Sequence, residues 1–311
     1  MRGACLQAKR CAFSPAGPCK GADHVLIQED AEARGDILYV TETQTAPSHI
    51  RKAGIDFFAG DTLLRAGQRL GAAALGVAAS GDHAALPVLK TLRVALLANG
   101  DELRPPGAPG ASGGVISSNP FAIAALARGW GAVPEDIGIA KDSAEAIIAR
   151  AEAAADADVI VAIGGASVGD HDHMKAAFVA LGYDLYFSKV AVRPGKPAWF
   201  AGKGDRRVLG LPGNPASAFV CAHLFLKPLL GACDALVETP ACLAAPMAAN
   251  GPRETFVRGK LLERADGLSA QPLERQDSAL LTPFLEADCL IRRLAHAPPA
   301  DAGAQTSIVR L

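Results

Sequence analysis

This sequence of 311 residues lacks an excess of charge of either sign. It has 31 Lys and Arg residues against 32 Asp and Glu residues, so its formal net charge is -1 at pH 7. Proteins that bind duplex DNA usually carry surplus basic charge, which neutralises the phosphates. The balance argues against nucleic acid as a partner, and local clusters of charge become more informative than the sum.

The sequence also lacks a hydrophobic run long enough to span a membrane. Its most apolar window, 217–237, is interrupted by His223, Lys227, Pro228 and Asp234, which favours a buried helix. No apolar run near the N-terminus resembles a secretory signal. The seven cysteines are odd in number and none stands in a CxxC pair, which is typical of reduced thiols. We therefore expect a cytoplasmic protein that does not contact a membrane.

Apolar runs separated by glycine and proline are abundant instead. Hydrophobic residues make up 50% and charged residues 20%, which is typical of a globular chain. Between 91 and 235, strands alternate with helices, and this predicts βαβ units with helices on both faces of a sheet. The expected strands are 93–99, 133–140, 159–165, 184–192, 199–203 and 206–211, and the expected helices are 119–128, 143–155, 173–181 and 214–230.

The flanking segments have a different pattern. The alternating runs 24–29 and 36–42, with the turn-like DAEARG between them, predict a hairpin, and a short helix is expected near 70–79. After 236, short strands are expected at 256–262, 268–273, 289–294 and 306–311. The expected fold is thus an incomplete N-terminal β region (1–90), a three-layer α/β domain with a parallel or mixed sheet (91–235), and a small C-terminal all-β domain (236–311).

Ligands of open α/β sheets bind at the carboxyl ends of the strands, so the loops that follow strands are the candidates for chemistry. The loop NGDEL (99–103) places two carboxylates, Asp101 and Glu102, at a strand end. In GGASVGDHD (164–172), glycines and helix N–H groups suit an anion, and Asp170 and Asp172 suit Mg²⁺. The histidines at 171 and 173 are interpreted as solvent-facing.

Two further loops carry cations and rigid turns. KVAVRPGKP (189–197) has Lys189, Arg193 and Lys196 within eight residues, which fits an oxyanion or phosphate clamp. In GLPGNPAS (210–217), Asn214 is expected to cap a helix whose first backbone N–H groups can donate to an anion. The prolines of this loop are expected to make it rigid. Ser217 falls inside that helix, so a Ser-His-Asp hydrolase is not supported. The four loops predict a Mg²⁺-dependent site for a substrate with several phosphates or another oxyanion.

The four loops, in this order, resemble the molybdopterin molybdenumtransferases, the MoeA/gephyrin family. GADHVLIQED (21–30), IRKAGIDFFAGDTLL (50–64) and ETFVRGKL (254–261) resemble that family as well, so the resemblance extends from about Ser14 to the C-terminus. It implies a molybdopterin-binding type of fold and a role in molybdenum cofactor biosynthesis. The implied reaction is the Mg²⁺-dependent insertion of molybdate into adenylylated molybdopterin with release of AMP. A homodimer whose sites are shared between subunits is also implied.

The resemblance assigns roles to residues. It places the family's acidic site residues on Asp56, Glu102, Asp142 and Asp172, its basic ones on Lys189, Arg193 and Arg258, and its loop prolines and serine on Pro212, Pro215 and Ser278. With the loop chemistry, the catalytic set becomes Glu102, Asp142, Asp172 and Lys189, and the metal set Glu102, Asp170 and Asp172. The substrate-binding set is Asp56, Gly164, Gly165, Ser167, Arg193, Lys196, Pro212, Asn214, Pro215, Arg258 and Ser278. We expect the catalytic set to gather at the carboxyl edge of the sheet.

The sequence departs from the family in several places. Ala98 and Asn99 stand where many members have Ser-Thr, and Arg193 stands where many have Lys. Nothing in 1–23 resembles the family's earlier Asp-Asn-Ser-Ala-Met-Asp-Gly-Tyr-Ala-like motif, so an N-terminally shortened member is expected. One alternative is an inactive molybdopterin-binding or scaffolding subunit. Another is a molybdopterin adenylyltransferase, against which the C-terminal β domain and the RPGKP and LPGNP loops argue.

Overall fold

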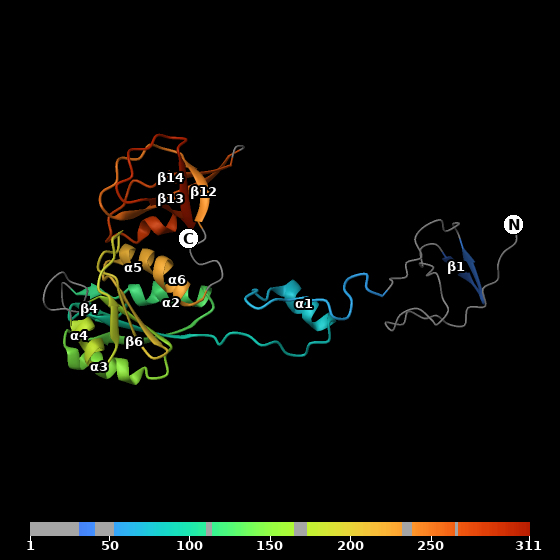
Figure 1. Cartoon of the computed structure of the whole chain (residues 1–311), viewed down its shortest axis with the longest axis horizontal. Helices are drawn as coiled ribbons and strands as arrows, with labels where there is room; N and C mark the ends of the chain where they lie inside the picture. The colour runs from blue at the N-terminus through green and yellow to red at the C-terminus, as the bar shows by residue number, and fades with distance from the viewer. Residues whose placement is uncertain (1–30, 41–52, 110–113, 165–172, 232–237, 265–266) are drawn as a thin grey trace. The chain divides into compact units, whose positions relative to one another are not determined.

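The structure, a computed structural model, describes residues 31–40, 53–109, 114–164, 173–231, 238–264 and 267–311 (Figure 1). The chain divides into two compact units, Met1–Leu86 and Pro87–Leu311. The described elements of the first unit are β1 (Ala31–Arg34), β2 (Ile37–Val40) and α1 (Ala72–Ser80). The other elements described below belong to the second unit.

The first unit contains a hairpin, but its first strand lies where the sequence predicts the turn. β1 and β2 pair antiparallel, with Glu32 opposite Tyr39. The turn is formed by Gly35 and Asp36, and Gly35 adopts the positive φ of 65° that a tight turn needs. Residues 31–34 of the predicted turn are therefore already in a strand, while 24–29 lie outside the described residues. α1 matches the helix expected near 70–79.

The second unit contains a six-stranded mixed sheet in the order β6–β3–β7–β11–β10–β8. Its strands are β3 (Arg93–Asn99), β6 (Val133–Ala140), β7 (Val159–Gly164), β8 (Asp184–Phe187), β10 (Trp199–Lys203) and β11 (Arg206–Leu211). The pairs β6–β3, β3–β7 and β7–β11 are parallel, whereas β10 is antiparallel to both of its neighbours. The carboxyl ends of β6, β3, β7 and β11 therefore lie along one edge, as the sequence predicts.

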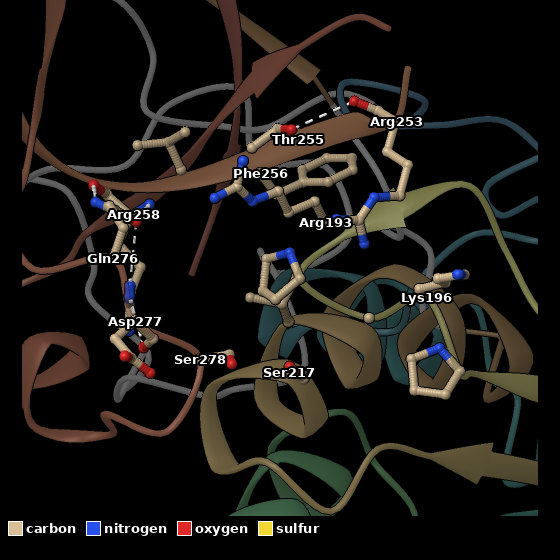
Figure 2. A pocket seen from close by; sticks show the side chains of 15 residues that line it. Arg193, Lys196, Ser217, Arg253, Thr255, Phe256, Arg258, Gln276, Asp277 and Ser278 are labelled. Carbon is tan, nitrogen blue, oxygen red and sulfur yellow. Dashed lines mark hydrogen bonds between the residues drawn. The ribbon is translucent and has the colours of Figure 1, made fainter. Parts of the chain in front are cut away.

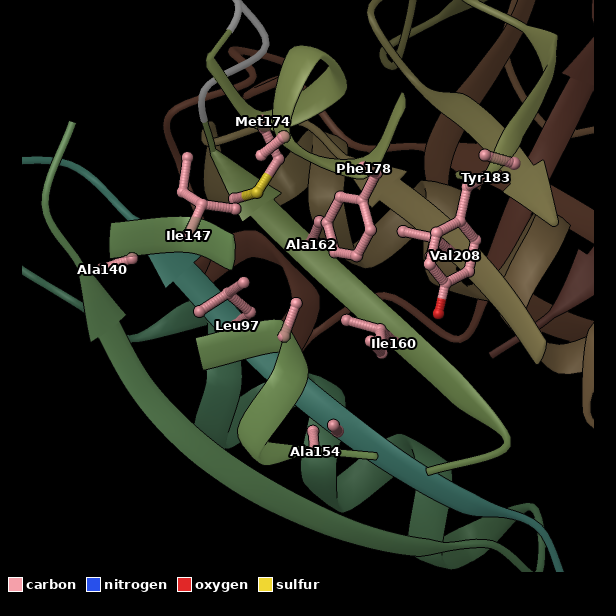
Figure 3. Packing of buried hydrophobic residues seen from close by; sticks show 14 of the residues in the cluster. Leu97, Ala140, Ile147, Ala154, Ile160, Ala162, Met174, Phe178, Tyr183 and Val208 are labelled. Atoms are coloured by element: carbon pink, nitrogen blue, oxygen red, sulfur yellow. The ribbon is translucent and has the colours of Figure 1, made fainter. Parts of the chain in front are cut away.

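Helices cover both faces of this sheet. They are α2 (Asn119–Gly129), α3 (Ala144–Ala153), α4 (His173–Ala180) and α5 (Pro215–Cys221). Successive side chains of a strand point to opposite faces, so Leu96 of β3 packs with α2 and α5, while Leu97 packs with α3 and α4. Figure 3 shows the second of these cores, where Leu97 lies in one cluster with Ile147 and Phe178. The near-continuous apolar runs of β3 and β7 follow from this burial on both faces.

The helix expected over 214–230 is present as three consecutive segments. α5 continues into a π-helical segment, η2 (Ala222–Leu226), and then into α6 (Lys227–Leu229). Hydrophobic periodicity alone does not distinguish a π turn from an α turn, so the sequence predicts one helix. None of the helices within the described ranges combines the length and apolarity needed to cross a bilayer.

The C-terminal strands, together with β9 from the α/β part, form a small barrel. Its strand order is β14–β12–β16–β15–β13–β9, and a further pairing of β14 with β13 closes it. They are β9 (Val192–Arg193), β12 (Glu238–Leu243), β13 (Glu254–Arg264), β14 (Gly267–Pro272), β15 (Cys289–Arg293) and β16 (Gln305–Arg310). A short 3-10 helix, η3 (Thr282–Leu285), lies between β14 and β15. The sequence predicts β13 to β16 but not β12, whose Pro240 is unfavourable in a strand.

Two features join the barrel to the α/β part. The strand predicted over 184–192 is present only over Asp184–Phe187, because the chain leaves the sheet after Phe187. Val192 and Arg193 pair instead with β13 of the barrel, in parallel. The second feature is an apolar cluster at the junction, in which Val220 and Leu224 from the helical run pack against Leu290 and Val309 of the barrel.

Candidate functional site

The loops after β3, β6 and β11, together with the carboxyl end of β7, line a cavity of about 820 Å³ at the carboxyl edge of the sheet, here called the strand-end cavity. Six of the predicted site residues line it: Glu102, Asp142, Gly164, Pro212, Asn214 and Pro215. Glu102 follows β3 and Asp142 follows β6, so the loops of two neighbouring parallel strands bring carboxylates to one space. Both side chains are exposed.

Reciprocal hydrogen bonds hold the first two loops together. The backbone N–H of Asp101 donates to Oδ2 of Asp142 at 3.1 Å, and the N–H of Asp142 donates to Oδ1 of Asp101 at 3.2 Å. The amide of Asn99 donates from Nδ2 to the carbonyl of Lys141 at 3.0 Å. Each of the two carboxylates uses one oxygen in this pairing.

Two glycines allow the close approach of these loops. Gly164 has a φ of 96°, and a Cβ atom there would lie 2.7 Å from the carbonyl oxygen of Asn99. Gly100 has a φ of 153°, and a Cβ atom there would lie 2.7 Å from Oε2 of Glu102. Side chains at these positions would separate β3 from β7 and displace the Glu102 carboxylate, so the site requires glycine at both.

Two asparagines at the starts of helices tie separate loops together. Ser118 takes the N-cap position of α2, and Asn119 donates from Nδ2 to the carbonyl of Gly213 at 2.7 Å. Asn214 does occupy the N-cap position of α5, but its side chain donates to Oγ of Ser278 at 3.1 Å. Both amides therefore connect segments that are far apart in the sequence, which a capping pattern cannot reveal.

A second cavity, of about 560 Å³, is lined by residues of both the α/β part and the barrel. We call it the cation cavity, because its lining includes Arg193, Lys196, Arg253 and Arg258 (Figure 2). Ser217 and Ser278 add two hydroxyl groups. The β9–β13 pairing, which sets Arg193 opposite Thr255, brings these distant segments together. Four predicted substrate-binding residues, Arg193, Lys196, Arg258 and Ser278, thus line one space.

Arg258 is almost fully buried and binds the loop that carries Ser278. Its Nη1 donates to the carbonyl of Leu280 at 2.8 Å, its Nη2 to that of Asp277 at 3.1 Å, and its Nε to Oε1 of Gln276 at 3.3 Å. Its guanidinium also lies 5.3 Å from the centre of the Phe284 ring. Burial lowers the pKa of Arg258 below its usual value, although a guanidinium remains charged at any physiological pH.

The two cavities adjoin. Pro197 lines both of them. Between them, the backbone N–H of Ala216 donates to the carbonyl of Ser278 at 3.0 Å, beside the Asn214–Ser278 bond. Ser278 therefore stands where the start of α5 meets the barrel loop.

The remaining predicted residues are not among the described residues that line these two cavities. Lys189 is exposed and is not among the residues that line either cavity. Asp56 is exposed in the first unit. Gly165, Ser167, Asp170 and Asp172 lie outside the described residues. Of the predicted metal ligands, only Glu102 is described.

The structure also adds residues that the sequence does not single out. His173, interpreted from sequence as solvent-facing, is half-buried and lines the strand-end cavity as the first residue of α4. Arg253 lines the cation cavity from the start of β13. A search of loops after sheet strands cannot find Arg253, because the barrel pairing brings it to the site.

Three family models match successive parts of the chain. One described as a probable molybdopterin binding domain matches residues 95–232, the range that holds the six-stranded sheet. Models of the MoeA C-terminal region (domain IV) and the MoeA N-terminal region (domain I and II) match 240–311 and 17–81. The fold is thus of the molybdopterin-binding class with a MoeA-type C-terminal domain.

Named relatives give the family. A molybdopterin molybdenumtransferase from Haemophilus influenzae is 30% identical over 281 residues, which cover 88% of this chain and 69% of the relative. One from Nostoc is 32% identical over 266 residues, 82% of this chain. A crystal structure of a molybdopterin biosynthesis MoeA protein from Pyrococcus horikosii has a TM-score of 0.72 and 26% identity, covering 93% of this chain and 72% of that one. The chain belongs to the molybdopterin molybdenumtransferase family.

The chain is shorter than several of these relatives. It spans 61% of the length of the Nostoc relative and 53% of that of a Mycobacterium tuberculosis relative. The roles assigned to single residues and the three domain bounds stay predictions.

Proposed function

We propose that this chain inserts molybdate into adenylylated molybdopterin, with AMP as the leaving group. The observation that carries the proposal is the pair of adjoining cavities, one with carboxylates at strand ends and one lined by cations. The reaction brings together a small oxyanion and a large substrate that contains a pyrophosphate linkage. Two adjoining spaces of different charge suit two such substrates.

The cation cavity is the proposed molybdate site. Molybdate is a dianion, and charge-assisted hydrogen bonds from arginine and lysine are the strongest that a protein offers to an oxyanion. Arg193 and Lys196 are exposed there, and the hydroxyl groups of Ser217 and Ser278 can donate further hydrogen bonds. Arg258 holds the loop that presents Ser278.

The strand-end cavity is the proposed site for the pterin and its phosphates. Glu102 and Asp142 supply carboxylate oxygens, the hard ligands that Mg²⁺ prefers, so this donor set fits the metal. With Asp170 and Asp172, which lie outside the described residues, they would hold Mg²⁺. The bound ion would draw negative charge from the pyrophosphate oxygens and so favour loss of AMP. The start of α5 and the stiff Pro212–Pro215 segment form the facing wall.

The proposal includes a homodimer in a reducing compartment, the cytoplasm. Support for the compartment comes from the thiols of Cys221, Cys242 and Cys289, which form no disulfide with one another in the described part of the chain. Support for the dimer is the family resemblance, with Arg258 and Ser278 on the C-terminal domain. A two-fold axis would place one subunit's barrel beside the other's sheet.

The test is turnover by the purified chain. Adenylylated molybdopterin, molybdate and Mg²⁺ are supplied, and AMP release and molybdenum cofactor formation are followed together. We expect both products, and we expect Glu102→Gln to lower the rate by roughly a hundredfold, the scale of losing one charged group that stabilises a transition state. Glu263→Gln, at an exposed site near the end of β13, is the matched control and should not change the rate.

Other outcomes separate the alternatives. Binding of the pterin with no AMP release above the enzyme-free control would reject the transferase and favour a binding subunit. Formation of adenylylated molybdopterin from ATP and molybdopterin would favour the adenylyltransferase. Unchanged turnover in Glu102→Gln would remove Glu102 from the site while leaving the activity in place.

A further inference from the structure

Arg253 and Arg193 lie side by side although they are 60 residues apart in the sequence. Thr255 of β13 is the partner of Arg193 of β9 in a parallel ladder. Side chains alternate between the two faces of a strand, so Arg253, two residues before Thr255, shares the face of Thr255 and of its partner Arg193. Figure 2 shows the Arg253 side chain extending toward Arg193, and both residues line the cation cavity.

The backbone of Arg253 is held in place by one asparagine. Nδ2 of Asn250 donates to the carbonyl of Arg253 at 2.9 Å and to that of Arg293 at 3.0 Å. Oδ1 of Asn250 accepts a hydrogen bond from the hydroxyl of Thr255 at 2.8 Å. The segment before β13 is thereby fixed to β15, so the backbone that carries the Arg253 side chain is held in place.

Three of the four cations that line this cavity have no counter-charge bound to them among the described residues. No ion pair of Arg193, Lys196 or Arg253 occurs within the part of the chain that the structure describes. Glu254, the nearest acid in sequence, is paired with Arg292. Among the described lining residues the one carboxylate is Asp277, and its Oδ1 accepts the N–H of Ala279 at 2.8 Å. Like charges around one space repel each other, and an anion relieves that repulsion.

Arg258, the barrel cation that the resemblance assigns to the site, is differently placed. Each of its three guanidinium nitrogens already donates to the 276–280 loop. Arg253, in contrast, has no side-chain hydrogen bond to a described residue, and its carbonyl oxygen accepts the hydrogen bonds from Asn250 and Thr255. Of these two barrel arginines, Arg253 is therefore the one whose guanidinium group is open to a ligand.

We infer that Arg253, together with Arg193, binds a tetrahedral dianion in the cation cavity, and that it is an additional substrate-binding residue of the barrel. This inference rests on the proposed function, in which molybdate is the dianion. Two planar guanidinium groups can each give two parallel N–H donors to such an oxyanion. A phosphate group of the pterin substrate presents the same chemistry, so the test uses both anions.

The test measures binding to the whole chain by equilibrium dialysis at fixed ionic strength, with molybdate in one series and inorganic phosphate in another. For each anion that the unsubstituted chain binds, Arg253→Ala should weaken the binding by roughly tenfold or more, which is the effect of losing a charge-assisted bidentate contact. Arg253→Lys should recover only part of the affinity, because an ammonium group cannot bind in a bidentate way. Arg264→Ala is the matched control, since it removes the same charge from the exposed end of β13.

The thermal midpoint of each variant is measured in parallel, and Arg253→Ala should match the unsubstituted chain. Loss of molybdate affinity alone assigns Arg253 to molybdate, and loss of phosphate affinity alone assigns it to the substrate phosphate. If the unsubstituted chain binds an anion and Arg253→Ala binds it equally well, the inference is wrong and the proposed function is untouched. If the unsubstituted chain binds neither anion, the proposed molybdate site itself fails.

Discussion

His223 is a buried titratable residue that takes no part in the proposed chemistry. It lies in the π-helical segment η2, and its Nδ1 is 2.9 Å from the carbonyl oxygen of Phe219. Its ring lies 5.1 Å from the ring of Trp130 and 4.9 Å from that of Phe219, measured between centres. Burial, aided by the charge of Lys227, lowers the pKa of His223 to about 4 from an ordinary value of 6.5. The neutral imidazole is thus part of the packing.

This burial predicts a specific dependence of stability on pH. Above pH 6.5, His223 is neutral in both the folded and the unfolded chain, so its contribution to stability is complete. Between pH 6.5 and 4 the unfolded chain binds a proton that the folded chain does not, so the free energy of unfolding falls as the pH falls. The slope from one such group reaches about 1.4 kcal/mol per pH unit.

The measurement is urea unfolding at pH 7.5 and pH 5, for the unsubstituted chain and for His223→Gln. Carboxylates change the free energy of unfolding of both proteins equally between the two pH values. Only the difference between the two proteins in the loss of unfolding free energy is therefore used. The unsubstituted chain should lose about 1–2 kcal/mol more than the variant on going to pH 5. Equal losses would mean that His223 is protonated in the folded state at pH 5.

At the scale of elements, what the sequence predicts well is what local pattern decides. β3 is found over the predicted residues because an apolar run ends at Gly100. α3 begins where expected, with Oγ of Ser143 accepting the N–H of Ala146 at 3.2 Å. β9 has no such pattern, because a strand of two residues exists only through its partner β13, which lies 60 residues further on. The turn of the first hairpin likewise follows Gly35 rather than the polar run.

The site divides in the same way. Glu102, Asp142 and Asn214 come together because each follows one of the parallel strands of the mixed sheet, which a rule about strand ends captures. The resemblance, and not any periodicity, supplies Arg258 and Ser278. Arg253 was not predicted by either route. Long-range pairing brings it to the site, and a single sequence carries no local record of such pairing.

The contact between the ends of β3 and β7 gives a prediction about elements. Gly164→Ala places a Cβ atom 2.7 Å from the carbonyl oxygen of Asn99 and forces alanine into a positive φ of 96°. The left-handed conformation alone costs about 1–2 kcal/mol, and the clash adds to it by separating two central strands. Gly204→Ala is the matched control, because Gly204 has a φ of 56° and open space around it.

Denaturant unfolding of the two variants checks this. Gly204→Ala should lose no more than about 2 kcal/mol, and Gly164→Ala should lose clearly more. If the two losses were equal, the ends of β3 and β7 would be able to move apart at no cost, and the close approach would not be a constraint on the site.

At the scale of the whole second unit, the site depends on how firmly the barrel is attached to the α/β part. The cation cavity takes residues from both, and so does the apolar cluster of the junction. β9 is the strand that the α/β part contributes to the barrel. The two parts should therefore unfold together, because opening either one exposes the apolar surface that it shares with the other.

Leu224 tests this coupling, because it is 5% exposed and belongs to the junction cluster. Leu224→Ala should cost about 2–5 kcal/mol, most of it at the contact between the two parts. Native-state hydrogen exchange is followed in β7 for the sheet and in β15 for the barrel. The two should open with one free energy in the unsubstituted chain and with different free energies in Leu224→Ala. Ile147→Ala, inside the α/β core alone, is the control and should lower both values together. If the opening free energies of β7 and β15 already differ in the unsubstituted chain, or still agree in Leu224→Ala, the apolar junction does not couple the two parts. The β9–β13 pairing would then be what holds the cation cavity together.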